Sequence, residues 1–244
     1  MTAPETIVWI TGATKGLGAG LVRACPYEDA HIFNASRSEH PDLENVHLDL
    51  ADPATWDNLR DSFRQHLGGF EGTRAIFVQN ACVEGVTGYA GEVDEDTYRR
   101  YVIGNGAAPL ILADWFLREV GPGYESGLVL LSSAAARMPF EAHSAYCAAK
   151  AGVEQWVRVV RRERARRGSG PWVVAVRPGF VDTPTVRWEA TLGDDEYPIA
   201  SRIRAGLEAG EALSPIAAAA DIWAALPPER DTSLLLFGAT PTGV

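Results

Sequence analysis

Short apolar segments alternate with longer amphipathic segments along the whole chain. Continuous apolar runs of this length are typical of strands buried on both faces of a parallel sheet. They cover residues 6–10, 31–36, 46–50, 75–78, 127–131, 172–176 and 233–237. Between them, apolar residues recur at three- and four-residue spacing, which predicts helices over 19–24, 53–67, 94–120, 144–167 and 214–226. The alternation predicts an α/β fold: a doubly wound parallel sheet, Rossmann-like, with helices on both faces and a single domain over 1–244.

Residues 185–212 interrupt this alternation. The segment is polar and contains Trp188, Tyr197 and several acidic residues. Segments of this kind that follow a strand often close over a bound substrate and exclude water from it. We therefore expect a substrate lid over residues 185–212.

Composition and charge narrow the possible partners. The chain has 244 residues, 46% of them hydrophobic, which is enough for one sizeable core. A net charge of −10 argues against nucleic acid and anionic membranes as partners. No apolar run approaches the roughly 20 residues that span a bilayer. The first residues lack the basic and apolar regions of a signal peptide, and the three cysteines are scattered, so we expect a cytoplasmic protein without disulfides or a metal site.

The first apolar run leads into a glycine-rich turn, Thr11-Gly12-Ala13-Thr14-Lys15-Gly16-Leu17-Gly18, which precedes a helical segment. Glycines let a ligand approach the backbone, and the start of a helix offers free N–H groups and the positive end of its dipole. This order of elements predicts a phosphate-binding site. The alternative is a tight turn without a ligand.

The second apolar run ends at Ser36-Arg37. In a dinucleotide fold this position lies beside the adenosine ribose, where a carboxylate suits free hydroxyls and an arginine suits a 2′-phosphate. With Lys15 in the glycine turn, the pattern favours NADP(H) over NAD(H), whereas a solvated loop charge is the alternative for Arg37. The third run ends at Asp49-Leu50, where Asp49 could accept the adenine amino group or cap a helix, although Asp52 fits the capping role better.

A candidate acid/base pair lies on the helix predicted over 144–167. Tyr146 and Lys150 are four residues apart, which places their Cβ atoms about 5–6 Å from each other, and Ser133 ends the preceding strand. A neighbouring ammonium favours the phenolate and lowers the tyrosine pKa, giving a general acid/base for a carbonyl or alcohol oxygen. Taken alone, such a pair is usually an ordinary surface contact. However, Lys15 and Lys150 are the only lysines in the chain, and both lie within candidate motifs.

With these motifs in this order, the chain resembles the classical short-chain dehydrogenases/reductases over nearly its whole length. The resemblance is carried by Thr11-Gly12-x-x-x-Gly16-x-Gly18, Asn80-Ala81, Asn105, Ser133, Tyr146-x-x-x-Lys150 and Pro178-Gly179-x-Val181-x-Thr183. Within the family, residues 145–153 and 178–184 are similar to the sepiapterin reductase and bacterial benzil reductase type.

The resemblance implies a role for each catalytic residue. Tyr146 would donate or accept the proton, and Lys150 would lower its pKa and bind the nicotinamide ribose. Ser133 would orient the substrate carbonyl, and Asn105 would hold the water of a proton relay. Together with Tyr146 and Lys150, the predicted cofactor-binding residues are Gly12, Thr14, Lys15, Gly16, Leu17, Gly18, Ser36, Arg37, Asp49, Leu50, Asn80, Ala81, Pro178, Gly179, Val181 and Thr183.

One departure from the family pattern falls at the expected substrate pocket. Cys82 stands where the family usually has glycine, so either the backbone there is ordinary or the thiol lines the pocket. The expected pocket walls are mostly apolar and partly aromatic, which favours a cyclic or aromatic substrate. The predicted substrate residues are Cys82, Met138, Phe140, His143, Phe180 and Trp188.

The sequence thus predicts an NADPH-dependent carbonyl reductase that converts a ketone or diketone to a secondary alcohol. The alternative is a catalytically silent NADP(H)-binding regulatory protein of the same fold. The helices predicted over 94–120 and 144–167 carry more apolar positions than one sheet face needs. We therefore expect a homodimer or homotetramer, because isologous pairing is the commonest symmetric assembly.

Overall fold

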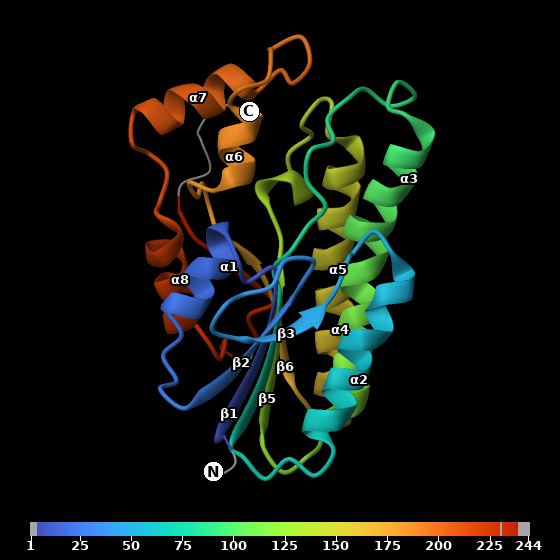
Figure 1. Ribbon diagram of the computed structural model, residues 1–244, viewed down its shortest axis with the longest axis vertical. Coiled ribbons are helices and arrows are strands. Elements are labelled where there is room, and N and C mark those ends of the chain that lie inside the picture. The colour runs from blue at the N-terminus through green and yellow to red at the C-terminus, as the bar shows by residue number, and fades with distance from the viewer. Residues whose placement is uncertain (1–3, 230, 239–244) are drawn as a thin grey trace.

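The computed structural model describes residues 4–229 and 231–238 (Figure 1). A seven-stranded parallel sheet forms the centre, in the order β3-β2-β1-β4-β5-β6-β7, so the predicted fold class is confirmed. The strands are β1 (Thr6–Thr11), β2 (Ala30–Ser36), β3 (Glu44–His47), β4 (Arg74–Gln79), β5 (Glu125–Leu131), β6 (Trp172–Arg177) and β7 (Leu234–Leu236). The order changes direction between β1 and β4, and ligands of open α/β sheets bind at the carboxyl ends beside such a switch point.

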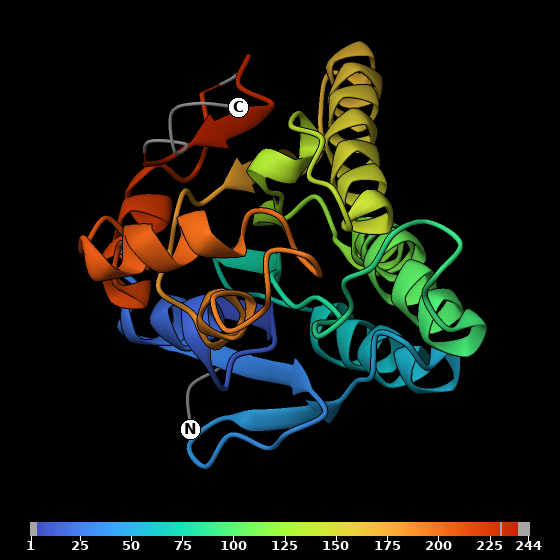
Figure 2. The ribbon, with the colours of Figure 1, turned by 90° about the horizontal axis from the view of Figure 1, so that it is seen from above.

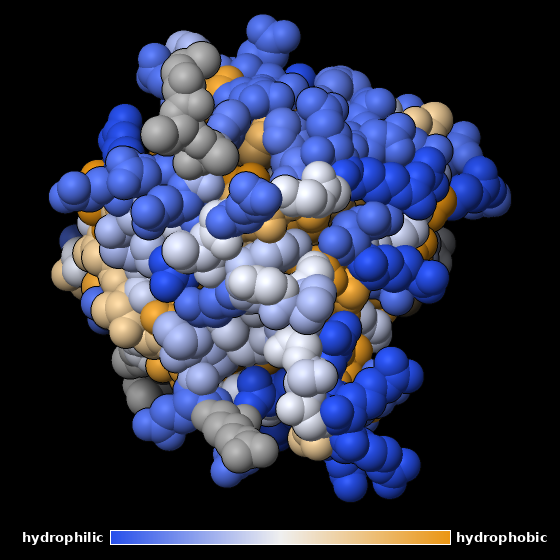
Figure 3. Space-filling view, turned by 90° about the horizontal axis from the view of Figure 1, so that it is seen from below, coloured by the Kyte–Doolittle hydropathy of each residue, from blue (hydrophilic) through white to orange (hydrophobic). Residues whose placement is uncertain are grey.

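Helices cover both faces of the sheet, as the view from above shows (Figure 2). One layer contains α1 (Gly16–Arg23) and α8 (Pro215–Ala224), and the other contains α2 (Trp56–Leu67), α4 (Ala108–Glu119) and α5 (Ser144–Arg167). The helix α3 (Glu95–Val102) precedes α4, while α6 (Pro184–Glu189) and α7 (Ala200–Glu208) lie beyond the carboxyl ends of the strands (Figure 1). Seen from below, the opposite end of the molecule is mostly hydrophilic (Figure 3). No helix in the described part of the chain is long and apolar enough to cross a membrane.

Strand β1 is buried on both faces, and its side chains alternate between two cores. Trp9 packs with the layer of α2, α4 and α5, whereas Val8 and Ile10 pack with α1 and α8. The Trp9 ring stacks on Phe33, with centroids 5.1 Å apart, and its Nε1 donates to Ser62 Oγ at 3.0 Å. This two-sided burial explains why the strand is a continuous apolar run.

Two predicted elements differ locally from the structure. The helix expected over 94–120 is divided by a π-helical turn, Ile103–Ala107, between α3 and α4. The strand expected over 46–50 ends at His47, because the Asp49 N–H donates to Thr55 Oγ1 at 2.9 Å instead of to a neighbouring strand. Asp52 caps the short 3₁₀ turn before α2 by accepting from the Ala54 N–H at 3.1 Å, as the sequence predicted.

We expect the substitution Phe63→Ala to lower the free energy of unfolding by about 3–5 kcal/mol, because it leaves a cavity among packed rings. The Phe63 ring lies 5.1 Å from that of Trp9 and 5.4 Å from that of Phe116, centroid to centroid, and is fully buried. Urea unfolding would measure the change. The control Ile216→Ala removes a side chain that is 46% exposed and should change stability by less than about 0.5 kcal/mol. Equal losses in the two variants would contradict this description of the core.

Candidate active site

A cavity of about 1300 Å³ opens at the carboxyl ends of the central strands. Its walls come from the glycine turn after β1, the segments after β2 to β6, and the helices α5, α6 and α7. Of the predicted residues, those lining it are Gly12, Thr14, Lys15, Gly16, Leu17, Ser36, Arg37, Asp49, Leu50, Asn80, Ala81, Cys82, Ser133, Met138, Phe140, His143, Tyr146, Lys150, Pro178, Gly179, Phe180, Val181, Thr183 and Trp188. The cavity therefore gathers nearly all of the predicted site, and Gly18 and Asn105 lie outside its lining.

The glycine turn has the geometry that a phosphate group requires. Gly12 has φ +69°, a conformation that side chains other than glycine rarely adopt. A Cβ on Gly18 would lie 2.0 Å from the Gly12 carbonyl oxygen, so Gly18 allows α1 to pack against the turn instead of facing the cavity. No side chain caps the start of α1, and its first turn contains no acidic residue. The free N–H groups there suit the pyrophosphate of a dinucleotide.

The residues at the end of β2 lie where an adenosine ribose would be expected. Arg37 is exposed and lines the cavity. Lys15 Nζ forms an ion pair with Glu84 Oε2 at 2.8 Å, and Glu84 also accepts a hydrogen bond from the Thr185 hydroxyl. Asp49 Oδ1 accepts from the Ala51 N–H at 2.9 Å, so this aspartate both stabilises its own turn and faces the cavity.

Two predicted asparagines hold the backbone around the cavity. Asn80 Nδ2 donates to the Thr11 carbonyl at 3.0 Å, and Thr11 Oγ1 accepts from the Asn80 N–H at 2.9 Å, which joins the end of β4 to the end of β1. Asn105 is buried in the π-helical turn; its Oδ1 accepts from the Val83 N–H at 2.8 Å and its Nδ2 donates to the Val83 carbonyl at 3.0 Å. Asn105 thus positions the loop after β4, and its role in a proton relay stays a prediction.

The candidate catalytic side chains meet where β5 ends and α5 begins. Ser133 follows β5, and its hydroxyl is hydrogen-bonded to the Tyr146 phenol. Lys150 is buried; its Nζ donates to the Leu131 carbonyl at 2.8 Å and lies 5.4 Å from the centre of the Tyr146 ring. The hydroxyl, phenol and ammonium therefore converge on one side of the cavity.

Burial raises the pKa of the Tyr146 phenol well above its usual value, and nearby Cys82, Tyr101 and Glu189 raise it further, while the Ser133 hydrogen bond lowers it. The sequence predicted a lowered pKa, and that prediction is wrong for this structure. The reason is that the phenol is desolvated, while the Lys150 ammonium is itself desolvated and bonded to the Leu131 carbonyl. Tyr146 is therefore a neutral phenol at physiological pH.

A buried carboxylate lies one helical turn beyond Lys150. Glu154 accepts from Ser132 Oγ at 2.7 Å and from Arg177 Nε and Nη2 at 2.6 and 2.8 Å, and Arg158 approaches it at 3.2 Å. Burial raises the Glu154 pKa, but these hydrogen bonds and charges outweigh it and hold the pKa below its usual value. The network joins the ends of β5 and β6 to α5.

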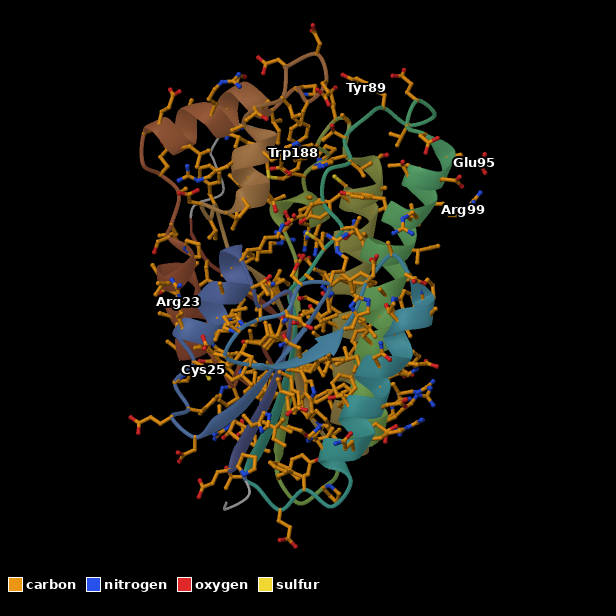
Figure 4. The ribbon with its side chains drawn as sticks, viewed as in Figure 1. Arg23, Cys25, Tyr89, Glu95, Arg99 and Trp188 are labelled. Carbon is orange, nitrogen blue, oxygen red and sulfur yellow. The ribbon has the colours of Figure 1, made fainter. Side chains whose placement is uncertain are left out.

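The end of the cavity beside α6 and α7 combines apolar walls with a polar contact to residues 185–212. His143 is buried, and its Nδ1 pairs with the Tyr197 hydroxyl at 2.9 Å. Burial lowers the pKa of His143 to about 4, so the imidazole is neutral near pH 7. Cys82 lines the cavity without a left-handed backbone, and burial raises its pKa, which keeps it a thiol. Trp188 lies on α6 and lines the cavity (Figure 4).

Sequence reasoning did not assign four residues of this region: Glu84, Glu154, Glu189 and Tyr197. Glu154 could have been identified, because it continues the helix face of Tyr146 and Lys150 at four-residue spacing. The other three occur in a loop and in residues 185–212, where no periodic pattern indicates which side chains point inward. The described residues contain no cluster of three or more histidine, cysteine or acidic side chains that could hold a metal ion.

We expect Glu154→Gln to destabilise the fold by about 3–5 kcal/mol, because it leaves Arg177 without its buried counter-charge. A carboxylate whose pKa is depressed by folding stabilises the protein above its unfolded pKa, and this contribution is lost as the pH falls through the folded pKa. In urea unfolding, the loss in free energy of unfolding relative to the wild type should therefore be largest near neutral pH and should shrink below about pH 4.

The matched control is Glu95→Gln, which breaks an exposed ion pair with Arg99 on α3 (Figure 4). Exposed pairs contribute little, so this variant should stay within about 0.5 kcal/mol of the wild type. A Glu154→Gln effect as small as the control's, or one that does not change with pH, would contradict the assigned network.

Comparison with known proteins places this geometry in a family. The family model for short chain dehydrogenases matches residues 6–191. A benzil reductase ((S)-benzoin forming) of Bacillus cereus is 24% identical over 223 residues, 85% of this chain and 88% of the relative. The enzyme of the same description from Bacillus subtilis (strain 168) is 25% identical over 214 residues, 84% and 87% of the two chains.

Among solved structures, the crystal structure of the KRED1-Pglu enzyme superposes with a TM-score of 0.79 at 22% identity, covering 95% of this chain and 100% of that chain. At this identity the likeness shows the fold. The family assignment depends instead on the family model, which matches most of the chain, glycine turn and catalytic segment included. The chain belongs to the classical short-chain dehydrogenase/reductase family of oxidoreductases, near the benzil reductases.

Proposed function

We propose that this protein is an NADPH-dependent carbonyl reductase in which Tyr146 protonates the carbonyl oxygen. The observation that carries the proposal is the convergence of Ser133, Tyr146 and Lys150 on one cavity with the glycine turn. The similarity to two benzil reductases supports reduction of a carbonyl.

The residues present fit a nicotinamide dinucleotide. The glycine turn and the open N-terminus of α1 would hold its pyrophosphate, and the segment from Pro178 to Thr183 would hold its nicotinamide end. When bound, the dinucleotide supplies the hydride that the carbonyl carbon receives. The chain itself has to bind and orient the two reactants, exclude water and supply a proton.

The three catalytic residues divide these tasks. The Ser133 hydroxyl positions the carbonyl oxygen beside Tyr146, and the neutral phenol donates its proton to that oxygen as negative charge develops there. The Lys150 ammonium stabilises the phenolate that remains until it regains a proton from solvent. Because burial raises the pKa of Tyr146, the phenol is in the protonated form that reduction needs.

The apolar lining of the cavity favours cyclic or aromatic ketones, including diketones, as the class of substrate. Met138, Phe140, Phe180 and Trp188 line the same cavity as the catalytic residues. Such surfaces bind a ring better than a sugar or a phosphate. Residues 185–212, which contain α6 and α7, would act as the lid over this end.

Replacing Tyr146 with phenylalanine should reduce turnover of an activated aryl ketone at least 10²–10⁴-fold, roughly the contribution of a positioned general acid. The ring retains its packing, so NADPH binding, followed by fluorescence titration, should change little. Lys150→Arg should also lose turnover, because a planar guanidinium does not reproduce the position of the ammonium. Wild-type turnover in the phenylalanine variant would show that Tyr146 is not the acid, and NADPH binding by a wild type that reduces no carbonyl would favour the silent regulator.

The preference for NADPH should depend on Arg37, whose charge-assisted hydrogen bonds to a 2′-phosphate are worth about 1.5–3 kcal/mol. The Lys15–Glu84 pair is exposed, so a phosphate can replace Glu84 at little cost. Arg37→Asp should weaken NADPH binding roughly 10–100-fold and bring NADH to parity. The control is Arg162→Asp, which makes the same change of charge at an exposed position of α5. It should alter neither the Kd for NADPH nor the Kd for NADH. Equal affinity of the wild type for both cofactors would contradict the assignment.

A further inference from the structure

One ionisable side chain in the cavity has no part in the proposed reaction. Glu189, the last residue of α6, lines the cavity together with Tyr146 and is half-buried. Among the described residues, its carboxylate has no hydrogen-bond or ion-pair partner. Withdrawing a carboxylate from water without a partner costs free energy. A ligand that carries a cation or a hydrogen-bond donor would recover part of this cost at Glu189.

The titratable groups that interact electrostatically with Glu189 belong to four segments around the cavity, and none of them is a cation. They are Glu84 and Cys82 of the loop after β4, Tyr101 of α3, Tyr146 of α5 and Tyr197 before α7.

The cationic residues of the glycine turn and of α6 and α7 have interactions of their own. Arg187, two residues before Glu189, is paired with Asp182 at 2.6 Å, and Lys15 is paired with Glu84 at 2.8 Å. Arg202 also lines the cavity and has an interaction of its own. The charge that acts on the Glu189 carboxyl is that of Glu84, which raises its pKa, so the field at this position is negative.

We infer that Glu189 is a specificity-determining residue that selects carbonyl substrates bearing a positive charge. This inference rests on the proposed function, because it assigns the substrate class of the same site. The carboxylate attracts a cation that enters beside the catalytic phenol, and the neighbouring Trp188 offers an aromatic face, which also attracts cations. Anionic carbonyl substrates are disfavoured by the same field.

Glu189 titrates in the physiological range. Burial, and to a smaller extent the nearby charge of Glu84, raise its pKa from the ordinary carboxyl value to about 7. The surrounding phenols and thiol have pKa values raised away from this range, and that of His143 is lowered to about 4. Since the carboxyl is charged only above its pKa, the ionised fraction rises about tenfold between pH 6 and pH 8.

The test compares two ketones of the same shape. One is para-(trimethylammoniomethyl)acetophenone, whose charge does not depend on pH, and the other is its uncharged para-neopentyl isostere. The measured quantity is the ratio of their kcat/KM values with NADPH at pH 6 and pH 8. Using a ratio cancels changes that affect both substrates equally, including protonation at the catalytic residues.

In the wild type we expect the cation-to-neutral ratio to rise about five- to tenfold from pH 6 to pH 8, following the ionised fraction of Glu189. Glu189→Gln should have a lower ratio that is the same at both values, and Glu189→Asp should retain a preference for the cation. The control Asp195→Asn makes the same change of charge on the exposed part of the lid, outside the cavity lining, and should behave as the wild type does.

Each outcome decides between the two proposals. If both ketones are reduced and the wild-type ratio is independent of pH, or if Glu189→Gln shows the same rise, the assignment of Glu189 is wrong while the reductase function stands. If neither ketone is reduced although NADPH binds, the proposed function fails and this inference fails with it. If the glutamine variant does not fold, the pH dependence of the cation-to-neutral ratio in the wild type and in Glu189→Asp still tests the assignment of Glu189.

Discussion

The buried carboxylate of Glu154 holds together the three elements that position the candidate catalytic residues. Its two oxygens are occupied by Ser132 and Arg177, so the ends of β5 and β6 and the face of α5 have one relative placement that satisfies the charge. Ser133 follows Ser132 directly, and Lys150 lies one turn before Glu154 on the same helix. A shift of any of these elements would leave a desolvated charge without its partner, which costs far more than a surface ion pair is worth.

Local sequence patterns predicted what depends on nearby residues. The apolar run at 172–176 and the strand Trp172–Arg177 nearly coincide, because a strand buried on both faces needs apolar residues throughout. The glycine turn was also readable, since its strand, turn and helix are contiguous. The π-helical turn was not, and its Asn105 is hydrogen-bonded to Val83, which is 22 residues away in the chain, so local patterns do not show this contact. Glu189 and Tyr197 were given no site role for the same kind of reason: residues 185–212 have no repeating pattern, and only the folded chain shows which of their side chains line the cavity.

The Tyr146 phenol shows how a correct pairing can suggest a wrong charge state. The four-residue spacing places Lys150 beside it, and pairwise reasoning then predicts a lowered pKa. The environment of the pair determines the opposite result, since both groups are withdrawn from water and acidic neighbours surround the phenol. A residue of this kind holds its proton until negative charge develops on a substrate oxygen, which suits a donor better than a base.

The packing role of Gly18 determines how this motif would change if the protein lost its cofactor during evolution. It belongs to the glycine motif, yet it lies outside the cavity lining and is required because α1 packs against the Gly12 carbonyl. Selection for a stable fold would therefore retain it in a descendant that no longer bound any nucleotide. Loss of the cofactor would first be recorded at Arg37 or Lys15, which face the cavity and which the packing of α1 does not require. In genome surveys, a glycine at the position of Gly18 therefore indicates a retained fold, whereas the charged residues beside the motif indicate whether the ancestral ligand is still in use.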